Sequence, residues 1–163
     1  MDAARKGIVT PEMEIVAKKE YRTTEEIRQL VAEGKVAIPA NKHHTCLNPE
    51  GIGSMLRTKI NVNLGVSRDC KDYNIEMQKV MSAVNMGAEA IMDLSSHGNT
   101  QPFRQKLTHE CPVMIGTVPV YDSVIHYQRD LATLTAQDFI DVVRLHAEDG
   151  VDLSLIHISE PTR

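Results

Sequence analysis

Strand-like apolar segments alternate with helix-like segments from residue 58 onward, at a spacing of roughly 30 residues. Between the first two strand-like segments, Met77, Val80, Met81 and Val84 recur at i, i+3, i+4 and i+7, which is the pattern of one helix face. This alternation favours βα units and a parallel sheet, because parallel neighbours need a crossover connection. The predicted strands are residues 58–64, 87–94, 112–120 and 151–158, and the later predicted helices are residues 99–109, 121–130 and 136–149.

The first 57 residues carry helix signals instead. Thr10-Pro11 offers an N-cap followed by proline at the first helical position, and Thr23-x-x-Glu26 has capping-box spacing. Residues 36–40 are predicted to form at most an edge strand, since they include a proline, and residues 41–53 to form a loop. The chain thus divides into a helical and loop segment (1–57), the first βα units (58–152) and a tail (153–163).

Composition excludes several classes of protein. A chain of 163 residues suits one ordinary domain, and its net charge of −4 provides no basic footprint for nucleic acid or an anionic membrane. Its longest apolar runs fall well short of the ~18 residues of a membrane span. The N-terminus lacks the apolar segment of a secretion signal, so we expect a cytoplasmic protein.

The cysteines and histidines give weak signals. Cys46, Cys70 and Cys111 lie far apart without C-x-x-C spacing, which indicates neither a disulfide framework nor a self-contained cysteine metal site. His43-His44, close to Cys46, is compatible with a metal site or with an exposed loop. The loop is favoured, because no second cysteine or carboxylate pair completes a site. His146 lies on an apolar helix face and is expected to be a hydrogen-bonded packing residue.

Polar side chains gather where three predicted strands end. In a β/α barrel the carboxyl ends of the strands form the usual ligand site, so these side chains are candidates for binding a substrate. An edge strand facing water and ordinary loop caps explain the same pattern, and both interpretations stay open here. The candidates are Lys59, Asn61 and Asn63 on the first strand, Asp93, Ser95 and His97 after the second, and Thr117, Tyr121 and Asp122 after the third.

Backbone amides in the loops after the first two of these strands form a second candidate site. The amides around Gly65, Ser67, Gly98 and Asn99 precede predicted helices and could hold a phosphate group.

Several blocks of residues, in order along the chain, resemble one enzyme family. The blocks cover residues 4–14 (Ala-Arg-Lys-Gly-Ile-Val-Thr-Pro-Glu-Met-Glu), 38–41, 59–65, 87–95 and 116–121. They are similar to those of the phosphomethylpyrimidine synthase family, the thiamin pyrimidine synthases, and the likeness extends over residues 4–152. The resemblance implies the N-terminal part of a (β/α)8 TIM-type barrel preceded by a short helical segment.

The resemblance also implies a function. In this family a cysteine-rich extension holds a [4Fe–4S] cluster that cleaves S-adenosylmethionine to a radical, and a metal site, possibly for zinc, contains histidines. The radical rearranges aminoimidazole ribotide into 4-amino-5-hydroxymethyl-2-methylpyrimidine phosphate, a carbon–carbon lyase reaction of thiamine biosynthesis. The implied partners are the ribotide, an electron donor for the cluster and, at full length, a second copy in a homodimer; no nucleic acid or membrane is implied.

Matching positions imply that Asn63, Met92 and Tyr121 contact the substrate. Equal intervals of 29 residues separate these three residues, and each lies at or just past the end of a predicted strand. Equal spacing in a βα repeat predicts the same height around a barrel mouth. His157 also falls at a position where the family has a substrate-binding histidine.

The chain departs from the family pattern in two respects. The cysteine motif, the metal-binding histidines and the later barrel strands are absent, so we expect a truncated and inactive enzyme, or an inert gene fragment. Residues 41–44 read Asn-Lys-His-His, where pyrimidine synthases usually have Asn-Ile-Asn-His-Pro. This is similar to the sister branch, 5-hydroxybenzimidazole synthase, which makes the lower ligand of anaerobic cobalamin; the pyrimidine branch is favoured as the commoner one.

The last residues form a separate case. Residues 153–163, Leu-Ser-Leu-Ile-His-Ile-Ser-Glu-Pro-Thr-Arg, resemble the translation of a transposon-type sequencing adapter. This predicts a non-native tail, with a genuine C-terminal strand as the alternative. His157 lies inside this tail, so its agreement with the family position is interpreted as chance.

Overall fold

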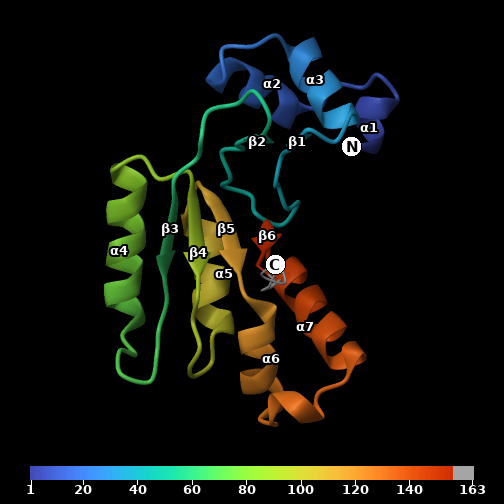
Figure 1. The fold of residues 1–163 in the computed structure, drawn as a ribbon. Helices are drawn as coiled ribbons and strands as arrows, with labels where there is room; N and C mark the ends of the chain where they lie inside the picture. The colour runs from blue at the N-terminus through green and yellow to red at the C-terminus, as the bar shows by residue number, and fades with distance from the viewer. Residues whose placement is uncertain (156–163) are drawn as a thin grey trace, which may run out of the picture.

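Three helices open the chain in the computed structural model, which describes residues 1–155. They are α1 (Asp2–Arg5), α2 (Pro11–Lys19) and α3 (Thr24–Ala32), and they pack together at one end of the molecule (Figure 1). This N-terminal segment has a core without residues of the parallel sheet. That core consists of Ala4, Met13, Val16, Ala17, Ile27, Leu30, Val31 and Val36.

Both predicted helix starts in this segment are confirmed, but only one has the expected cap. Thr23 Oγ1 accepts a hydrogen bond from the Glu26 amide at 3.2 Å, and Glu26 Oε2 accepts one from the Thr23 amide at 2.8 Å. This is the predicted capping box. α2 begins at Pro11 as expected, but the side chain of Thr10 forms no cap hydrogen bond.

A two-stranded antiparallel ribbon follows. β1 (Val36–Ala37) confirms the predicted edge strand, and it pairs with β2 (Ile52–Gly53). The loop prediction for residues 41–53 is therefore wrong at its end. Two residues are too few to show the alternation that identifies a strand. Gly53 has a φ of +147°, and a Cβ there would lie 2.1 Å from the Lys35 carbonyl oxygen, so glycine permits this close pairing.

Four parallel strands form the main sheet. They are β3 (Asn61–Leu64), β4 (Ala90–Asp93), β5 (Met114–Thr117) and β6 (Leu153–Ser154), in the order β3-β4-β5-β6. The connecting elements are α4 (Tyr73–Asn85), α5 (Gln101–Glu110), α6 (Pro119–Tyr127), the 3-10 helix η1 (Leu131–Thr133) and α7 (Ala136–Glu148). The predicted α/β class is confirmed. The sheet of the described residues does not close, and the complete barrel stays a prediction.

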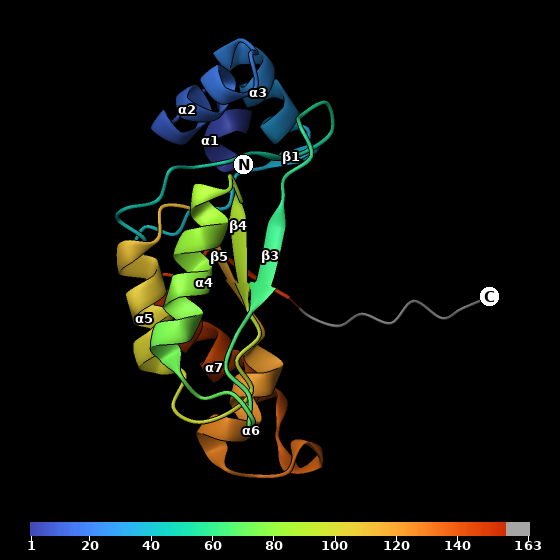
Figure 2. The ribbon, with the colours of Figure 1, turned by 90° about the vertical axis from the view of Figure 1, so that its left-hand side faces the viewer.

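Helices α4 and α5 cover one face of this sheet (Figure 2). Ile91 and Ile115, which are register neighbours on β4 and β5, are fully buried there among Val80 of α4 and Leu107 of α5. We call this the helix-covered face. It supplies the main hydrophobic core, because each strand directs alternate side chains to it.

The opposite face, called the open face below, is turned toward the viewer in Figure 1. Asn63, Met92 and Gly116 lie in register across β3, β4 and β5 on this face. Met92 and Leu153 occupy the space beside Gly116, where a Cβ would lie 2.4 Å from Leu153 Cδ1 and 2.6 Å from Met92 Cε. No helix of residues 1–155 covers the open face (Figure 2).

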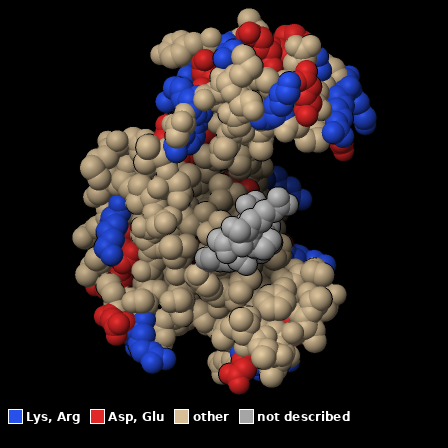
Figure 3. Space-filling model, in the orientation of Figure 1, with Lys and Arg blue, Asp and Glu red and all other residues tan. Residues whose placement is uncertain are grey.

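Charge is distributed unevenly over the surface. Lys, Arg, Asp and Glu of both signs stand side by side on the N-terminal helices, whereas few charged side chains appear around the centre of the open face (Figure 3). None of the helices in the described part of the chain combines the length and apolarity needed to cross a bilayer.

His44 joins the N-terminal segment to the sheet. Its Nδ1 lies 2.6 Å from Asp152 Oδ2 and its Nε2 lies 2.7 Å from the Cys111 carbonyl oxygen, both at a buried site. Burial lowers the pKa of His44, but the Asp152 carboxylate and the Cys111 carbonyl more than offset this and raise the pKa. The expectation of an exposed loop is wrong for His44, because Asp152, far away in the sequence, supplies its buried partner.

Candidate functional site

Asn63 and Met92 stand next to each other on the open face. They are register partners on β3 and β4, and the exposed Asn63 accepts a hydrogen bond from Asn61 Nδ2 at 2.8 Å. Met92 is 6% exposed and lies over Gly116. The structure thus places an amide that can donate and accept hydrogen bonds directly beside an apolar thioether platform.

Tyr121 lies at a different level from this pair. The register partner of Met92 on β5 is Gly116, and Tyr121 comes after the end of β5, in the first turn of α6, 37% exposed. The predicted equal height is therefore wrong for Tyr121. The reason is local: residues 65–72 and 94–100 form loops after β3 and β4, whereas Val118 alone joins β5 to α6. The predicted strand 112–120 and helix 121–130 place this junction too late, since α6 begins at Pro119.

Whether these three residues bind one ligand stays a prediction, with its geometry now defined. Asn63 and Met92 form the floor, and Tyr121 stands at the rim beyond the carboxyl end of β5. The fourth predicted residue, His157, lies outside the described residues. Near the amino ends of the strands, the open face forms a cavity of about 410 Å³, lined by Met92, Met114 and residues of β2.

Buried polar groups lie on the helix-covered side of the same strand ends. Asp93 is 5% exposed and its Oδ1 accepts hydrogen bonds from the Ser95 amide (2.9 Å) and hydroxyl (2.5 Å). Ser95 Oγ in turn accepts one from the Val66 amide at 3.1 Å, which ties the loop after β3 to the loop after β4. Burial raises the pKa of Asp93. Asp93 is thus turned away from the open face, contrary to its listing as a ligand candidate.

The phosphate-binding expectation is wrong for the loop after β3. The Gly65 amide donates to Glu76 Oε2 at 3.0 Å, and the Ser67 amide donates to the Cys70 carbonyl at 2.9 Å. Glu76 is a fully buried residue of α4, so its carboxylate takes the position that an anion would need. Sequence spacing alone gives no sign of this internal partner.

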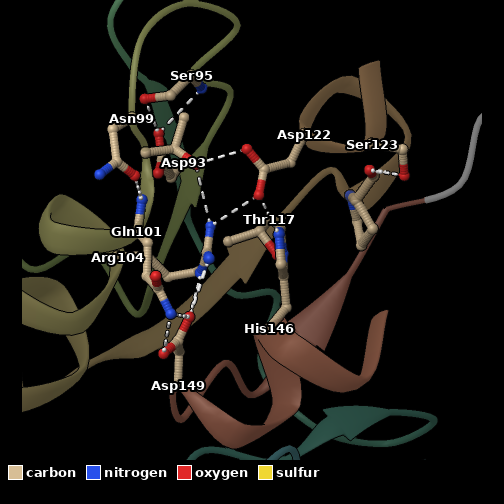
Figure 4. Close-up of polar contacts among 12 residues, drawn as sticks. Asp93, Ser95, Asn99, Gln101, Arg104, Thr117, Asp122, Ser123, His146 and Asp149 are labelled. Atoms are coloured by element: carbon tan, nitrogen blue, oxygen red, sulfur yellow. Dashed lines mark hydrogen bonds and ion pairs between the residues drawn. The ribbon is translucent and has the colours of Figure 1, made fainter. Parts of the chain in front are cut away.

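A second buried cluster surrounds Asp122 (Figure 4). Its Oδ1 accepts from Thr100 Oγ1 at 2.5 Å, and its Oδ2 lies 3.2 Å from Arg104 Nη1 and 2.8 Å from His146 Nε2. Burial would raise the pKa of Asp122, but hydrogen bonds from His146 and Thr100 and the charge of Arg104 lower it to about 2. Asp122 is therefore a carboxylate at neutral pH.

The same cluster includes a hydrogen-bonded relay. His146 Nδ1 lies 2.8 Å from Thr117 Oγ1, so Thr117, His146 and Asp122 form a continuous chain of contacts. The cavity beside them measures only about 10 Å³ and Thr117 is 2% exposed, so no substrate can reach the hydroxyl. The chain holds β5, α6 and α7 together, and the prediction that His146 is a packing residue is confirmed.

The cysteines do not fit an iron–sulfur cluster. Cys46 lies against the Cys111 carbonyl oxygen (3.3 Å from Sγ), while Cys70 lies near Glu76 of α4. Within residues 1–155, no three His, Cys, Asp or Glu side chains form a group able to hold a metal ion. No reaction step is therefore assigned to a cluster held by these residues.

A parallel βα sheet with an amide, a thioether and a phenol at its strand ends belongs to the class of α/β domains that bind small molecules there. The model of the radical SAM ThiC family matches residues 1–161, and the chain belongs to this family.

Curated relatives agree with this assignment. Phosphomethylpyrimidine synthase of Alkaliphilus oremlandii is 59% identical over 157 residues, which are 96% of this chain and 36% of the relative. The enzymes of the same name from Clostridioides difficile and Clostridium botulinum (strain Hall) are each 56% identical, and 36% of each is covered. The chain thus spans little more than a third of the length of these relatives.

Proposed function

We propose that this chain supplies the aminoimidazole ribotide-binding part of a phosphomethylpyrimidine synthase of thiamine biosynthesis. The observation that supports this most is the in-register pair Asn63–Met92 on an uncovered sheet face, with Tyr121 at the rim, in a chain 56–59% identical to enzymes of that name. The amide of Asn63 suits a polar edge of the imidazole or ribose. Tyr121 can stack on the imidazole or donate to the phosphate, and Met92 offers apolar contact.

The remaining parts of the proposal concern the longer enzyme. A [4Fe–4S] cluster with S-adenosylmethionine supplies the radical that starts the lyase reaction, and zinc is a further proposed metal. Their ligands are not provided by residues 1–155, so the chain alone is proposed to be inactive. A cluster electron donor, a homodimeric assembly and a cytoplasmic location complete the proposal.

The proposed three parts of the chain need a separate test for the tail. Residues 153–163 are proposed to be non-native, although Leu153–Ser154 pairs with β5 as β6. Sequencing of the genomic DNA downstream of the codon for Asp152 tests this directly. A family-like continuation in place of the adapter-like residues is the expected result, and an unchanged reading frame contradicts it.

Ligand binding tests the substrate site. Residues 1–152 of this chain replace the matched segment of the Alkaliphilus oremlandii enzyme, and calorimetry measures binding of aminoimidazole ribotide. Tyr121→Phe is expected to weaken binding by about 1–3 kcal/mol, the value of a good hydrogen bond to a ligand. Tyr127→Phe, on the last turn of the same helix, is the matched control. Equal affinity in both variants contradicts the proposed site.

Product analysis of the same chimera tests the reaction. Anaerobic turnover with S-adenosylmethionine and a reductant is expected to yield the pyrimidine phosphate and 5′-deoxyadenosine. Formation of 5-hydroxybenzimidazole instead would assign the chain to the sister branch, which the Asn-Lys-His-His sequence at residues 41–44 keeps under consideration. The names of the relatives favour the pyrimidine product.

A further inference from the structure

The first turn of α6, which carries Tyr121, lacks the usual means of anchoring a helix start. Val118 is its N-cap and provides no side-chain hydrogen bond, and Pro119 occupies the first helical position. The turn is closed by the Tyr121 amide, which donates to the Val118 carbonyl at 3.0 Å, and by Ser123 Oγ, which donates to the Pro119 carbonyl at 2.8 Å. These bonds stay within the turn and cannot fix its position relative to the sheet.

One side of α6 also faces empty space. A cavity of about 580 Å³ lies between the loop after β4 and α6, and its lining includes His97, Asn99, Val124 and His126. Close packing therefore does not hold the helix on this side. Some other contact must set the position of its first turn.

Asp122, the residue after Tyr121, provides that contact. Its carboxylate is 7% exposed and binds Thr100 at the N-cap of α5, Arg104 within α5 and His146 of α7 (Figure 4). The three donors come from two other helices, and both carboxylate oxygens are used. The carboxylate thus links the first turn of α6 to its neighbours at three points.

From this arrangement we propose that Asp122 is a positioning residue for Tyr121, which acts by holding the first turn of α6 at the rim of the open face. The inference rests on the proposed function, in which Tyr121 contacts the ribotide. Buried ionic groups often add little net stability, and fixing one geometry among several is a role that such groups can serve. Asp122 itself is directed away from the ligand and takes no part in the chemistry.

Asp149 makes a matched control possible. It is also buried (9% exposed) and binds the same arginine, with Arg104 Nε 2.9 Å from its Oδ2, and it accepts from Gln105 Nε2 at 2.7 Å. However, it lies at the C-cap of α7 and carries no predicted ligand residue. Asp122→Asn and Asp149→Asn therefore remove the same charge from the same cluster, but only the first lies beside Tyr121.

The first experiment observes Tyr121 directly. The 163-residue chain is labelled with 3-fluorotyrosine, and Tyr121→Phe assigns one of the four tyrosine signals by fluorine NMR. Asp122→Asn is expected to shift or broaden the Tyr121 signal, while Asp149→Asn leaves it in place. Thr100→Val, which removes one donor only, is expected to give a smaller change and covers the case in which Asp122→Asn does not fold. An unmoved Tyr121 signal, or equal changes in Asp122→Asn and Asp149→Asn, overturns the proposal.

The second experiment measures the consequence for binding. In the chimeric synthase, Asp122→Asn is expected to weaken ribotide binding at least fivefold, and Asp149→Asn less than twofold. If Tyr121→Phe does not alter binding while Asp122→Asn still moves the Tyr121 signal, the proposed substrate contact fails and the anchoring of α6 stands. If Tyr121→Phe weakens binding and Asp122→Asn does not, the positioning role is overturned and the substrate site stands.

Discussion

The two faces of the parallel sheet are built from adjacent residues but solve different problems. On the helix-covered face, Ile91 and Ile115 are fully buried under α4 and α5. On the open face, their neighbours Met92 and Gly116 form a shallow apolar floor beside the exposed Asn63. A strand alternates its side chains between faces, so a one-residue step moves from the stabilising core to the ligand face.

The polar groups follow the same division. Behind the strand ends, buried carboxylates bind backbone amides and an arginine, as Glu76, Asp93 and Asp122 do. In front, the candidate ligand groups are attached to the segments that these carboxylates hold. The difference indicates that the helix-covered face sets stability and geometry, while the open face sets affinity.

The largest effect is expected from removing the central cation of the helix-covered side. Arg104→Met preserves volume but leaves Asp122 and Asp149 buried without their shared partner. The free energy of unfolding should fall by about 3–5 kcal/mol, the usual cost of breaking a buried ion pair. Urea denaturation followed by circular dichroism measures this. The exposed pair of Arg144 with Asp141 supplies the control, since Arg144→Met should change stability by less than about 0.5 kcal/mol.

A neighbouring pair tests the division of the two faces most directly. Ile91→Ala opens a closed cavity under α4 and α5 and should cost about 2–5 kcal/mol. Met92→Ala empties a position on the open face, where water can enter, so only the transfer cost of about 1–2 kcal/mol remains. Both are measured by the same denaturation. Equal losses for Ile91→Ala and Met92→Ala would show that the open face is covered in solution, for example by a second copy of the chain.

The Asp122 carboxylate gives an expected pH dependence. Its pKa in the folded state is about 2, below its ordinary value of 3.8, so its ionised form stabilises the fold above about pH 4. This contribution of about 2 kcal/mol should be lost as the pH falls from about 4 through 2. The stability difference between the wild type and Asp122→Asn should shrink over this range. Asp93, whose pKa burial raises, acts in the opposite direction but equally in both proteins. A constant difference contradicts the buried ion cluster.

A smaller effect is expected at Gly116, between the two faces. A Cβ there would lie 2.6 Å from Met92 Cε and 2.4 Å from Leu153 Cδ1, which are flexible side-chain ends. Gly116→Ala should therefore cost only about 1 kcal/mol, at the low end for overpacking. It should also displace Met92 and weaken ribotide binding by the chimera. In the double variant with Met92→Ala, the stability cost of the alanine at position 116 should disappear; additive losses would show that the two side chains do not meet.

Local signals in the sequence were sufficient for most of the fold. The capping boxes at Thr23 and Thr135, the βα alternation and the polar side of β3 all depend on neighbouring residues, and the structure confirms them. The junction at Pro119 was misplaced because β-branched residues continue through it. The strand β2 was missed because it is too short to have a pattern.

Long-range partners could not be predicted. His44 finds Asp152, and Asp122 finds Arg104 and His146, across the fold. Asp93 and Asp122 were noticed as strand-end polar groups, but the sequence does not show to which face they turn. Counting from Met92 would have helped for Asp93, since one residue along a strand reverses the face.

The smallest effect on stability, and the clearest separation of the two faces, is expected at Asn63. Its side chain is exposed and its hydrogen-bond partner in the structure is the equally exposed Asn61, so Asn63→Ala should change the free energy of unfolding by less than about 0.5 kcal/mol. Ribotide binding by the chimera should nevertheless weaken by about 1–3 kcal/mol, because a buried ligand group would lose its partner. Asn85→Ala, at the exposed end of α4, is the control and should change neither quantity. A loss of stability without a loss of affinity in Asn63→Ala would reverse the assignment, since it would place Asn63 among the residues that hold the sheet and leave the open face without a polar ligand contact.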